Sequence, residues 1–315
     1  MARKTYRYYN YFMKITLFVP TYNAGKLWES WIQSYQQQKL KPDKVIIIDS
    51  SSRDKTVELS EQANFEITVI PTREFNHGGT RNLPASLSKD ADIFVFLTQD
   101  ALLSSPFSLQ KIIEPFSDSQ VGAVYGRQLP HKDANPLAAH ARLFNYPDKT
   151  IIKSQEDIAR LGIKTVFISN SFAAYRASLF RELGGFPDNV IMAEDMHLAA
   201  RIIEAGYKIA YSTEATVYHS HNYTPWQEFK RYFDTGVFQK QENWIQEKFG
   251  KPTGEGRRFV LSEMKYLTKN APFWIPRAIF TTLLKFVGYK LGTYYGILPK
   301  TFIRFFSMHK QYWNK

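Results

Sequence analysis

The sequence contains no cysteine, which excludes a disulfide framework, a thiolate nucleophile and any zinc or iron–sulfur site built on cysteine. Glycine and proline are also sparse, at 16 and 15 of 315 residues, whereas 44% of the residues are hydrophobic. This composition excludes collagen-like, low-complexity and wholly disordered chains, because it supplies enough apolar surface to offset the entropy lost on folding. A chain of this length is expected to form one large domain or two small ones.

Long hydrophobic runs are missing at both ends of the chain. Residues 1–13 are basic and rich in tyrosine, and they lack the apolar core and the small-residue cleavage site of a signal peptide. We therefore expect residues 1–13 to be an N-terminal extension, unless translation starts at Met13. Near the C-terminus Arg277 and Lys285 interrupt the apolar residues, so no stretch reaches the roughly 18 residues that a membrane-spanning helix needs.

Acidic residues are scarce in the C-terminal part of the chain. Residues 251–315 hold 12 Lys and Arg against 2 acids, Glu255 and Glu263, which gives a net charge of +10. The other 250 residues hold 29 basic and 27 acidic side chains, a net charge of +2. The protein is therefore a nearly neutral body with a strongly basic tail segment. This asymmetry favours a local explanation of the basic charge over general nucleic-acid binding.

The same tail segment is rich in aromatic residues, with 14 Phe, Tyr or Trp between positions 251 and 315. A basic, aromatic, amphipathic segment fits contact with anionic headgroups at a membrane interface. A helical subdomain that packs on the rest of the protein is the alternative, and the two are compatible. Pro276 is suited to open a helix, in which apolar residues recur at helical spacing at Ile279, Phe280, Leu283, Leu284, Val287 and Leu291.

The body of the chain alternates apolar strands with helical segments. Residues 15–19, 45–48, 67–70 and 93–97 form continuous apolar runs, which are typical of strands buried on both faces of a parallel sheet. The body is therefore predicted to be α/β. Polar motifs follow each strand, and in open parallel sheets the ligand crevice lies at the carboxyl ends of the strands. We expect these motifs to converge on one site.

Five short motifs occur in order along the body. They read FVPTYN at 18–23, IDSSSRD at 48–54, GTRN at 79–82, TQD at 98–100 and AED at 193–195. In this order and spacing they resemble the signature of family 2 inverting glycosyltransferases with the GT-A fold, over roughly residues 14–222. The form HGGTRN at 77–82 resembles the bacterial rhamnosyltransferases that build cell-surface polysaccharides.

The resemblance implies a fold and a donor site. The fold is a GT-A type, Rossmann-like and mostly parallel sheet flanked by helices in residues 14–250, followed by a C-terminal basic aromatic helical segment in residues 251–315. A nucleotide-sugar donor would lie across the strand ends. The donor-binding residues implied are Pro20, Thr21, Asn23, Asp49, Ser51, Gly79, Arg81, Gln99 and Asp100.

A divalent cofactor, Mg²⁺ or Mn²⁺, is also implied. In the resembling family an Asp-x-Asp motif binds the ion, which in turn holds the donor diphosphate. Here Thr98 stands in place of the first acid, so metal binding would be weaker, or would be completed partly by phosphate oxygens or by further ligands. His219 and His221 could supply them, because residues i and i+2 of a strand point to the same side. Two surface histidines without a special role are the alternative.

Ordinary structural roles compete with the donor-site interpretation. Asp49 could accept hydrogen bonds from the nucleotide, or it could cap the turn before the next helix. Arg81, after two glycines and near a helix N-terminus, suits a diphosphate, but it could also be a solvated charge on a flexible loop.

Two acids, Glu194 and Asp195, precede an expected helix at 196–205. Acids at a helix start commonly only complement the helix dipole. The resemblance implies that one of them removes the proton from the acceptor hydroxyl, and we favour Asp195, with Glu194 as the alternative base or a support. Residues 167–175 are expected to form a strand on the acceptor side, where Asn170 and Ser171 could orient the acceptor sugar.

The predicted function is inverting transfer of a sugar, with dTDP-L-rhamnose as the first-choice donor, onto a lipid-linked glycan. The protein would act as a peripheral enzyme at the cytoplasmic face of the membrane, where the basic tail would contact anionic headgroups. Nucleic acid is not an expected partner. A transferase that uses a UDP-hexose is one alternative. A non-enzymatic, basic membrane-surface or nucleic-acid-binding protein is the other, although it leaves the ordered acids unexplained.

Overall fold

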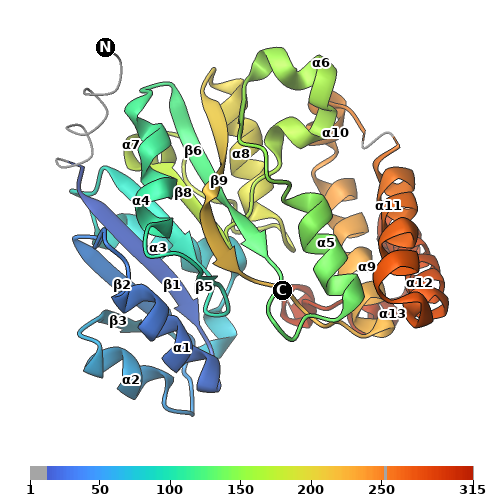
Figure 1. The fold of residues 1–315 in the computed structure, drawn as a ribbon, viewed down its shortest axis with the longest axis horizontal. Coiled ribbons are helices and arrows are strands. Elements are labelled where there is room, and N and C mark those ends of the chain that lie inside the picture. Colours follow the sequence, from blue (N-terminus) through green and yellow to red (C-terminus); the bar gives the residue numbers. More distant parts are fainter. Residues whose placement is uncertain (1–12, 252–253, 315) are drawn as a thin grey trace.

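One nine-stranded sheet organises the chain in a computed structural model that describes residues 13–251 and 254–314 (Figure 1). Residues 1–12 of the extension predicted at residues 1–13, and with them the choice of start, lie outside the described residues. The strand order is β3-β2-β1-β4-β8-β6-β9-β5, with β7 paired to β9. The strands are β1 Ile15–Thr21, β2 Lys44–Asp49, β3 Glu66–Val69, β4 Ile93–Leu97, β5 Leu102–Leu103, β6 Val121–Leu129, β7 Ile151–Lys153, β8 Phe172–Arg176 and β9 Lys208–Tyr218.

Six of these strands point the same way. β1 pairs in parallel with β2 and β4, β2 with β3, and β6 with β9, whereas β8 joins the two groups by running antiparallel to both β4 and β6. The mostly parallel α/β sheet predicted from the apolar runs is therefore confirmed. The carboxyl ends of β1, β2, β3, β4, β6 and β9 consequently lie along one edge of the sheet.

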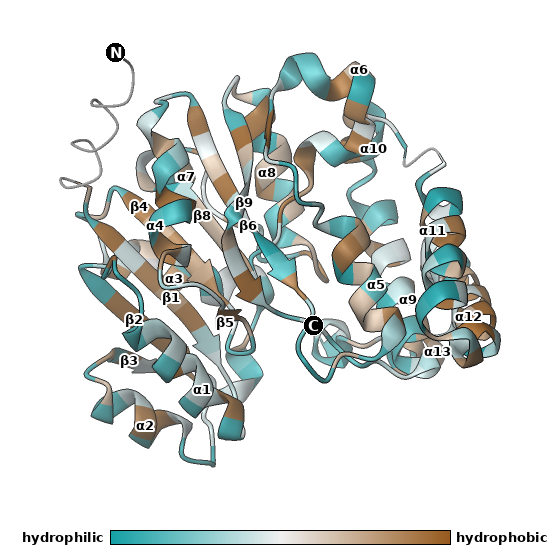
Figure 2. Ribbon diagram, in the orientation of Figure 1, coloured by the Kyte–Doolittle hydropathy of each residue, from teal (hydrophilic) through white to brown (hydrophobic). Residues whose placement is uncertain are grey.

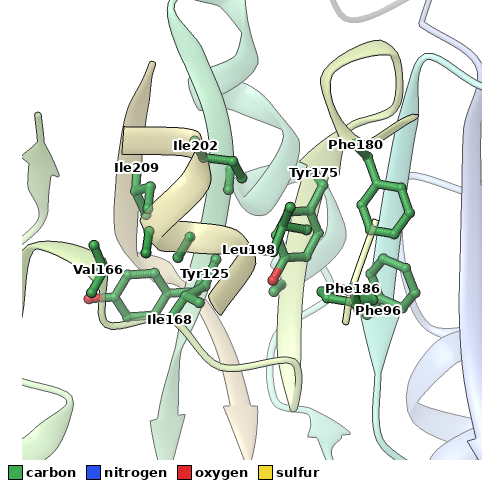
Figure 3. Close-up of a cluster of buried hydrophobic side chains, with 14 of the residues drawn as sticks. Phe96, Tyr125, Val166, Ile168, Tyr175, Phe180, Phe186, Leu198, Ile202 and Ile209 are labelled. Atoms are coloured by element: carbon green, nitrogen blue, oxygen red, sulfur yellow. The ribbon is translucent and has the colours of Figure 1, made fainter. Parts of the chain in front are cut away.

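Alternate side chains of the central strands enter two separate cores, as the period of two requires. Leu17, Val19, Val95 and Leu97 lie on one face, under α1 (Gly25–Gln36) and α4 (Ser108–Ile113). On the other face, Phe96 and Tyr175 pack with residues of α7 (Ala177–Glu182) and α8 (Glu194–Glu204), as the close-up in Figure 3 shows. Two further helices, α2 (Thr56–Gln62) and α3 (His77–Leu87), complete the N-terminal half.

Most of the remaining helices stand together beyond β6 and β9, on the side away from β1–β3 (Figure 1). The two longest, α9 and α12, lie against each other. These helices are α5 Pro136–Asn145, α6 Ile158–Leu161, α9 Pro225–Gln241, α10 Asn243–Phe249, α11 Glu255–Asn270, α12 Ile275–Thr293 and α13 Lys300–Phe306.

Two sequence expectations about local structure are wrong. The strand expected at 167–175 begins only at Phe172. Residues 167–171 form a loop instead, and the carbonyl of Phe167 accepts a hydrogen bond from the ammonium of the buried Lys153. The loop expected around Gly78 and Gly79 is instead the first turn of α3. Gly78 is needed there because a Cβ would lie 1.8 Å from the Pro187 carbonyl oxygen, so its close contact is with the protein's own backbone.

Candidate active site

The strand ends bring the predicted motifs to one edge of the sheet. Asp49 is the last residue of β2, Asp100 lies three residues beyond β4, and His219 directly follows β9. A cavity of about 520 Å³ extends from this edge toward α9 and α12, and it is lined by both predicted acids, Glu194 and Asp195, and by both histidines, His219 and His221. A second cavity of about 370 Å³ is lined by Asp100 and also by His221.

A larger cavity, of about 1020 Å³, is elsewhere. Ile15 at the start of β1 and Ala210 near the start of β9 line it, so it lies toward the amino ends of the strands. Its charged lining is mixed, with Lys39, Lys41 and Lys111 beside several acids. None of the residues predicted to bind or react lines this cavity, and it is not the site.

Asp100, His219 and His221 form a compact cluster. Nε2 of His219 lies 3.4 Å, and Nε2 of His221 3.7 Å, from the same carboxylate oxygen of Asp100. One ligand atom from each residue lies within 4.8 Å of the others, which is close enough for a single metal ion to be shared. Burial alone would raise the pKa of Asp100, but the two histidines and Thr98 lower it well below its ordinary value, so the carboxylate is ionised.

Gln128 orients one of these histidines. Its buried Oε1 accepts hydrogen bonds from an Nη of Arg142 and, at 2.9 Å, from Nδ1 of His219, while its Nε2 donates to Ser169. A guanidinium can only donate, so the amide oxygen must face Arg142 and His219. Nδ1 of His219 therefore carries a proton, and Nε2 is the ring nitrogen that faces Asp100. The contact of Gln128 with His219 could not be predicted from the sequence, because nothing in the order of the motifs links β6 to His219.

Glu194 and Asp195 open α8 after a strained residue. Ala193 has φ of +58°, in the left-handed region that a residue with a side chain rarely adopts, and this conformation directs the start of α8 into the cavity. Both carboxylates contact Asn170: its side-chain amide donates to Glu194 (3.1 Å) and its backbone N–H to Asp195 (2.9 Å). The second oxygen of Asp195 accepts the Met196 N–H at 2.8 Å.

The two acids have opposite electrostatic environments. Glu194 forms a buried ion pair with Arg81 (3.1 Å); burial would raise its pKa, but the guanidinium charge of Arg81 is the main opposing cause, and the pKa is lowered. Burial together with the neighbouring Glu194 charge raises the pKa of Asp195 to about 7. A carboxylate with a pKa near neutral pH is well matched to take a proton from a hydroxyl and to release it afterwards.

The C-terminal segment also reaches this site. Asp234 of α9, fully buried, accepts the backbone N–H groups of Met308 (2.8 Å) and His309 (3.0 Å). Nδ1 of His309 lies 3.2 Å from Nε2 of His77, and Arg81 donates to the carbonyl of His77. Burial lowers the pKa of His77 and lowers that of His309 to about 4, so near pH 7 both rings are neutral and one donates to the other. Sequence motifs gave no indication of His309.

Several residues predicted to bind the donor are hydrogen-bonded to their neighbours at the carboxyl ends of β1, β2 and β4. Asp49 is fully buried, and its carboxylate accepts hydrogen bonds from Thr21 Oγ1 (2.9 Å) and from the Ser52 N–H and hydroxyl (2.7 and 2.6 Å). Asn23 accepts the Arg53 N–H, and Gln99 accepts the Tyr22 N–H. These bonds tie the ends of β1, β2 and β4 together; Pro20 is the penultimate residue of β1.

Several predicted contacts have partners within the protein. The Ser51 hydroxyl donates to Ile70, and the Gly79 N–H donates to the side chain of Asn76. Arg81 is paired with Glu194 instead of being a solvated charge. A contact between these residues and a donor stays a prediction.

The predicted acceptor residues differ in position. Asn170 is 3% exposed, and Tyr175 donates to its Oδ1 at 2.8 Å, so its amide is fully engaged with Tyr175 and Glu194. It therefore holds the acids in place; it also lines the 520 Å³ cavity, and its contact with an acceptor sugar stays a prediction. Ser171 lines the 520 Å³ cavity, and its role as an acceptor contact stays a prediction.

Comparison with known proteins agrees with this geometry. The profile of the family "Glycosyl transferase family 2" matches residues 16–184. The chain is 59% identical over 303 residues to the O-antigen chain rhamnosyltransferase RfbN of Salmonella typhimurium, covering 96% of each chain. It is also 59% identical over 300 residues to the O-antigen chain rhamnosyltransferase WbaN of Salmonella anatum, covering 95% of each.

Solved structures show the same fold. The mannosyltransferase PcManGT of Pyrobaculum calidifontis, solved with GDP-Man and Mn²⁺, superposes with a TM-score of 0.55 at 20% identity, over 96% of this chain and 85% of that one. TarS of S. aureus superposes with a TM-score of 0.53 at 14% identity, over 89% of this chain and 55% of that one. The GT-A fold predicted from the ordered motifs is thereby confirmed.

Proposed function

The chain belongs to glycosyltransferase family 2, and from that membership we propose that it is an inverting rhamnosyltransferase that uses dTDP-L-rhamnose in O-antigen synthesis. Rhamnose is chosen as the sugar because the sequence is 59% identical to two O-antigen chain rhamnosyltransferases over nearly the whole chain. The acceptor is a lipid-linked glycan at the cytoplasmic face of the membrane. Residues 14–250 form the catalytic domain, and residues 251–315 form a helical segment attached to it.

The Asp100 cluster fits a divalent ion. It combines one ionised carboxylate with two imidazoles, and the contact between Nδ1 of His219 and Gln128 leaves Nε2 as the nitrogen available to coordinate. We assign Asp100, His219 and His221 as ligands, and Mn²⁺ suits this mixed nitrogen and oxygen set better than Mg²⁺, which prefers oxygen ligands. Such an ion, when bound, would neutralise charge on the leaving diphosphate.

Asp195 is the general base in this proposal. Its carboxylate lines the cavity and is anchored by two backbone N–H groups, so it is held in place for an acceptor hydroxyl. It accepts the hydroxyl proton while the hydroxyl oxygen bonds to the anomeric carbon and the bond from that carbon to the diphosphate breaks. One displacement inverts the anomeric configuration. Glu194, kept ionised by Arg81, supports Asp195 by raising its pKa toward neutrality.

The donor is the part of the proposal that experiment should address first. We would titrate the purified protein by calorimetry with dTDP-rhamnose, UDP-glucose and UDP-GlcNAc, each with Mn²⁺ and with EDTA. We expect binding of dTDP-rhamnose to be selective and to weaken at least tenfold in EDTA. The variant His219→Ala should weaken Mn²⁺-dependent donor binding, whereas His131→Ala, next to the cluster but outside it, serves as the control. A preference for a UDP sugar would keep the fold and mechanism and replace the donor.

A further inference from the structure

The outer face of α12 is an exposed apolar surface. Ile279, Phe280, Leu283, Phe286 and Val287 are 38–60% exposed and recur at the spacing of one helical face. We call these five residues the α12 outer face. Figure 2 shows α12 as a largely hydrophobic helix at the margin of the molecule, on the far side from β1–β3. Single exposed apolar residues are common, but a contiguous set of this kind marks an interaction surface.

Tight packing fixes which face of α12 points outward. Gly288 and Gly292 lie on the opposite face, where a Cβ would come within 2.4 Å of the Phe229 carbonyl oxygen and 2.0 Å of the Phe233 carbonyl oxygen of α9. Ala278 and Thr281 are buried on the same inner side. The helix thus has small residues inside and large apolar residues outside, the reverse of an ordinary surface helix. Small residues at a helix contact and apolar residues facing outward are characteristic of helices in contact with lipid.

The segment that carries this surface is basic. Residues 271–315 contain no Asp or Glu, while Arg277, Lys290, Lys300 and Arg304 are all exposed. Lys290 follows Phe286 by one turn, and its ammonium lies 5.9 Å from the centre of that ring. Long basic side chains that extend from an apolar face can place their charges among anionic headgroups while their stems remain in the apolar layer.

We propose that the α12 outer face, with Arg277, Lys290 and Arg304, docks on the surface of an anionic lipid bilayer. Within the described part of the chain no helix is long and apolar enough to cross a bilayer, and the segment instead has the features of an interfacial helix. A second copy of the chain is a poorer occupant. A two-fold contact would place one uniformly basic surface against an identical one, and no acid of residues 271–315 could compensate.

Docking in this way would orient the active site. Lys285, on the inner side of α12, and Phe259 of α11 both line the 520 Å³ cavity that contains Asp195. The helix that contacts the bilayer is therefore also a wall of the cavity. This consequence rests on the proposed lipid-linked acceptor, whereas the docking itself does not.

Vesicle sedimentation tests the docking separately from the chemistry. The full chain would be mixed with vesicles of phosphatidylcholine alone or with 30% phosphatidylglycerol. We expect strong binding only to the anionic vesicles, and a fall of at least tenfold in the double variant Phe280→Gln/Leu283→Gln. Both side chains are more than half exposed, so folding should not depend on them. The matched control is Val69→Gln/Leu87→Gln, which changes two exposed apolar residues of the body.

A charge variant and a second readout complete the experiment. Arg277→Gln/Lys290→Gln/Arg304→Gln should lose the preference for anionic vesicles. Calorimetric donor binding should be unchanged in every variant, so a failed donor assignment would be visible without affecting the docking result. Equal sedimentation of the wild type and the Phe280/Leu283 variant would overturn the proposal. So would a dimer in solution that the same double variant abolishes, because that result would assign the surface to a second copy.

Discussion

At the scale of single residues, Asp195 is defined by what surrounds it more than by its place at a helix start. An acid that merely complemented a helix dipole would be solvated and ionised well below neutral pH. Asp195 instead shares Asn170 with a second acid, Glu194, whose lowered pKa keeps it ionised near neutral pH, and burial beside Glu194 raises the pKa of Asp195 to about 7. Its protonation state should therefore control the reaction in the neutral range.

This environment predicts the pH dependence of transfer. The base must be ionised, and an elevated pKa means that ionisation is completed only as the pH rises, so kcat/KM should increase with pH up to about 7 and then level off. Asp195→Asn should reduce kcat by about 10²–10⁴-fold while donor binding persists. Glu194→Gln removes the like charge and should move the rising limb to lower pH. Initial rates of rhamnosyl transfer from pH 5 to 9 would measure all three.

The two variants also distinguish the two acids. If Glu194→Gln abolished transfer while Asp195→Asn remained active, the base would be Glu194. A rising limb at the same pH in the wild type and in Glu194→Gln would show that another group controls the profile. Circular dichroism of each variant serves as the folding control.

The location of a single residue could be predicted from the sequence where that residue follows a strand of the sheet. Asp100, His219 and His221 each follow a strand that ends at the same edge, so topology was sufficient to predict that they meet. Gln128 and Asn170 could not be assigned in this way. Their roles depend on which atom of each amide faces which neighbour, and this is decided by Arg142 and Tyr175, which come from other elements.

At the scale of elements, the contact between α9 and α12 depends on the absence of side chains. Gly292 approaches the carbonyl oxygen of Phe233, which is backbone and cannot move aside as a side chain would. Gly292→Ala should therefore separate the helices and cost about 1–3 kcal/mol, the usual range for overpacking. At roughly 2–4 °C per kcal/mol for a chain of this size class, the thermal midpoint should fall by several degrees in scanning fluorimetry.

Gly256→Ala is the matched control for this substitution. Gly256 also lies within a helix, α11, but apart from its chain neighbours and the backbone of its own helix no atom of the described residues lies within 4 Å of its added Cβ. Alanine should be neutral there or raise the free energy of unfolding by up to about 1 kcal/mol, because it favours the helix. Equal midpoints for Gly292→Ala and the wild type would mean that the two helices can separate at no cost.

The same contact shows what the sequence leaves open about an element. The helix expected from Pro276 onward is confirmed as α12, and its apolar spacing was visible. The sequence did not show whether that apolar stripe faces the body or the outside, because either orientation satisfies the helical periodicity. The glycines decide it: only the small-residue side fits against the α9 backbone, so the large residues must point outward.

At the scale of the whole molecule, the C-terminal end of the described chain contacts the candidate active site. The last described residues pass α9, where Asp234 holds Met308 and His309, and Tyr312 donates to the Asn189 carbonyl, a few residues before Glu194. A continuous path of contacts then runs from His309 through His77 and Arg81 to Glu194. The helical segment is thus part of the wall of the catalytic cavity as well as an attachment to it.

This contact predicts that His309 positions the catalytic acids from the far end of the chain. His309→Ala removes the bond to His77, worth about 0.5–1.5 kcal/mol, and should lower kcat by about 2–10-fold while the donor Kd is unchanged. His309→Asn should retain most activity, because the side-chain amide can place a polar atom where Nδ1 lies. Lys310→Ala, at the exposed neighbouring position, should match the wild type. If His309→Ala kept full kcat, or if Asn restored nothing, the tail would contact the site without supporting its chemistry.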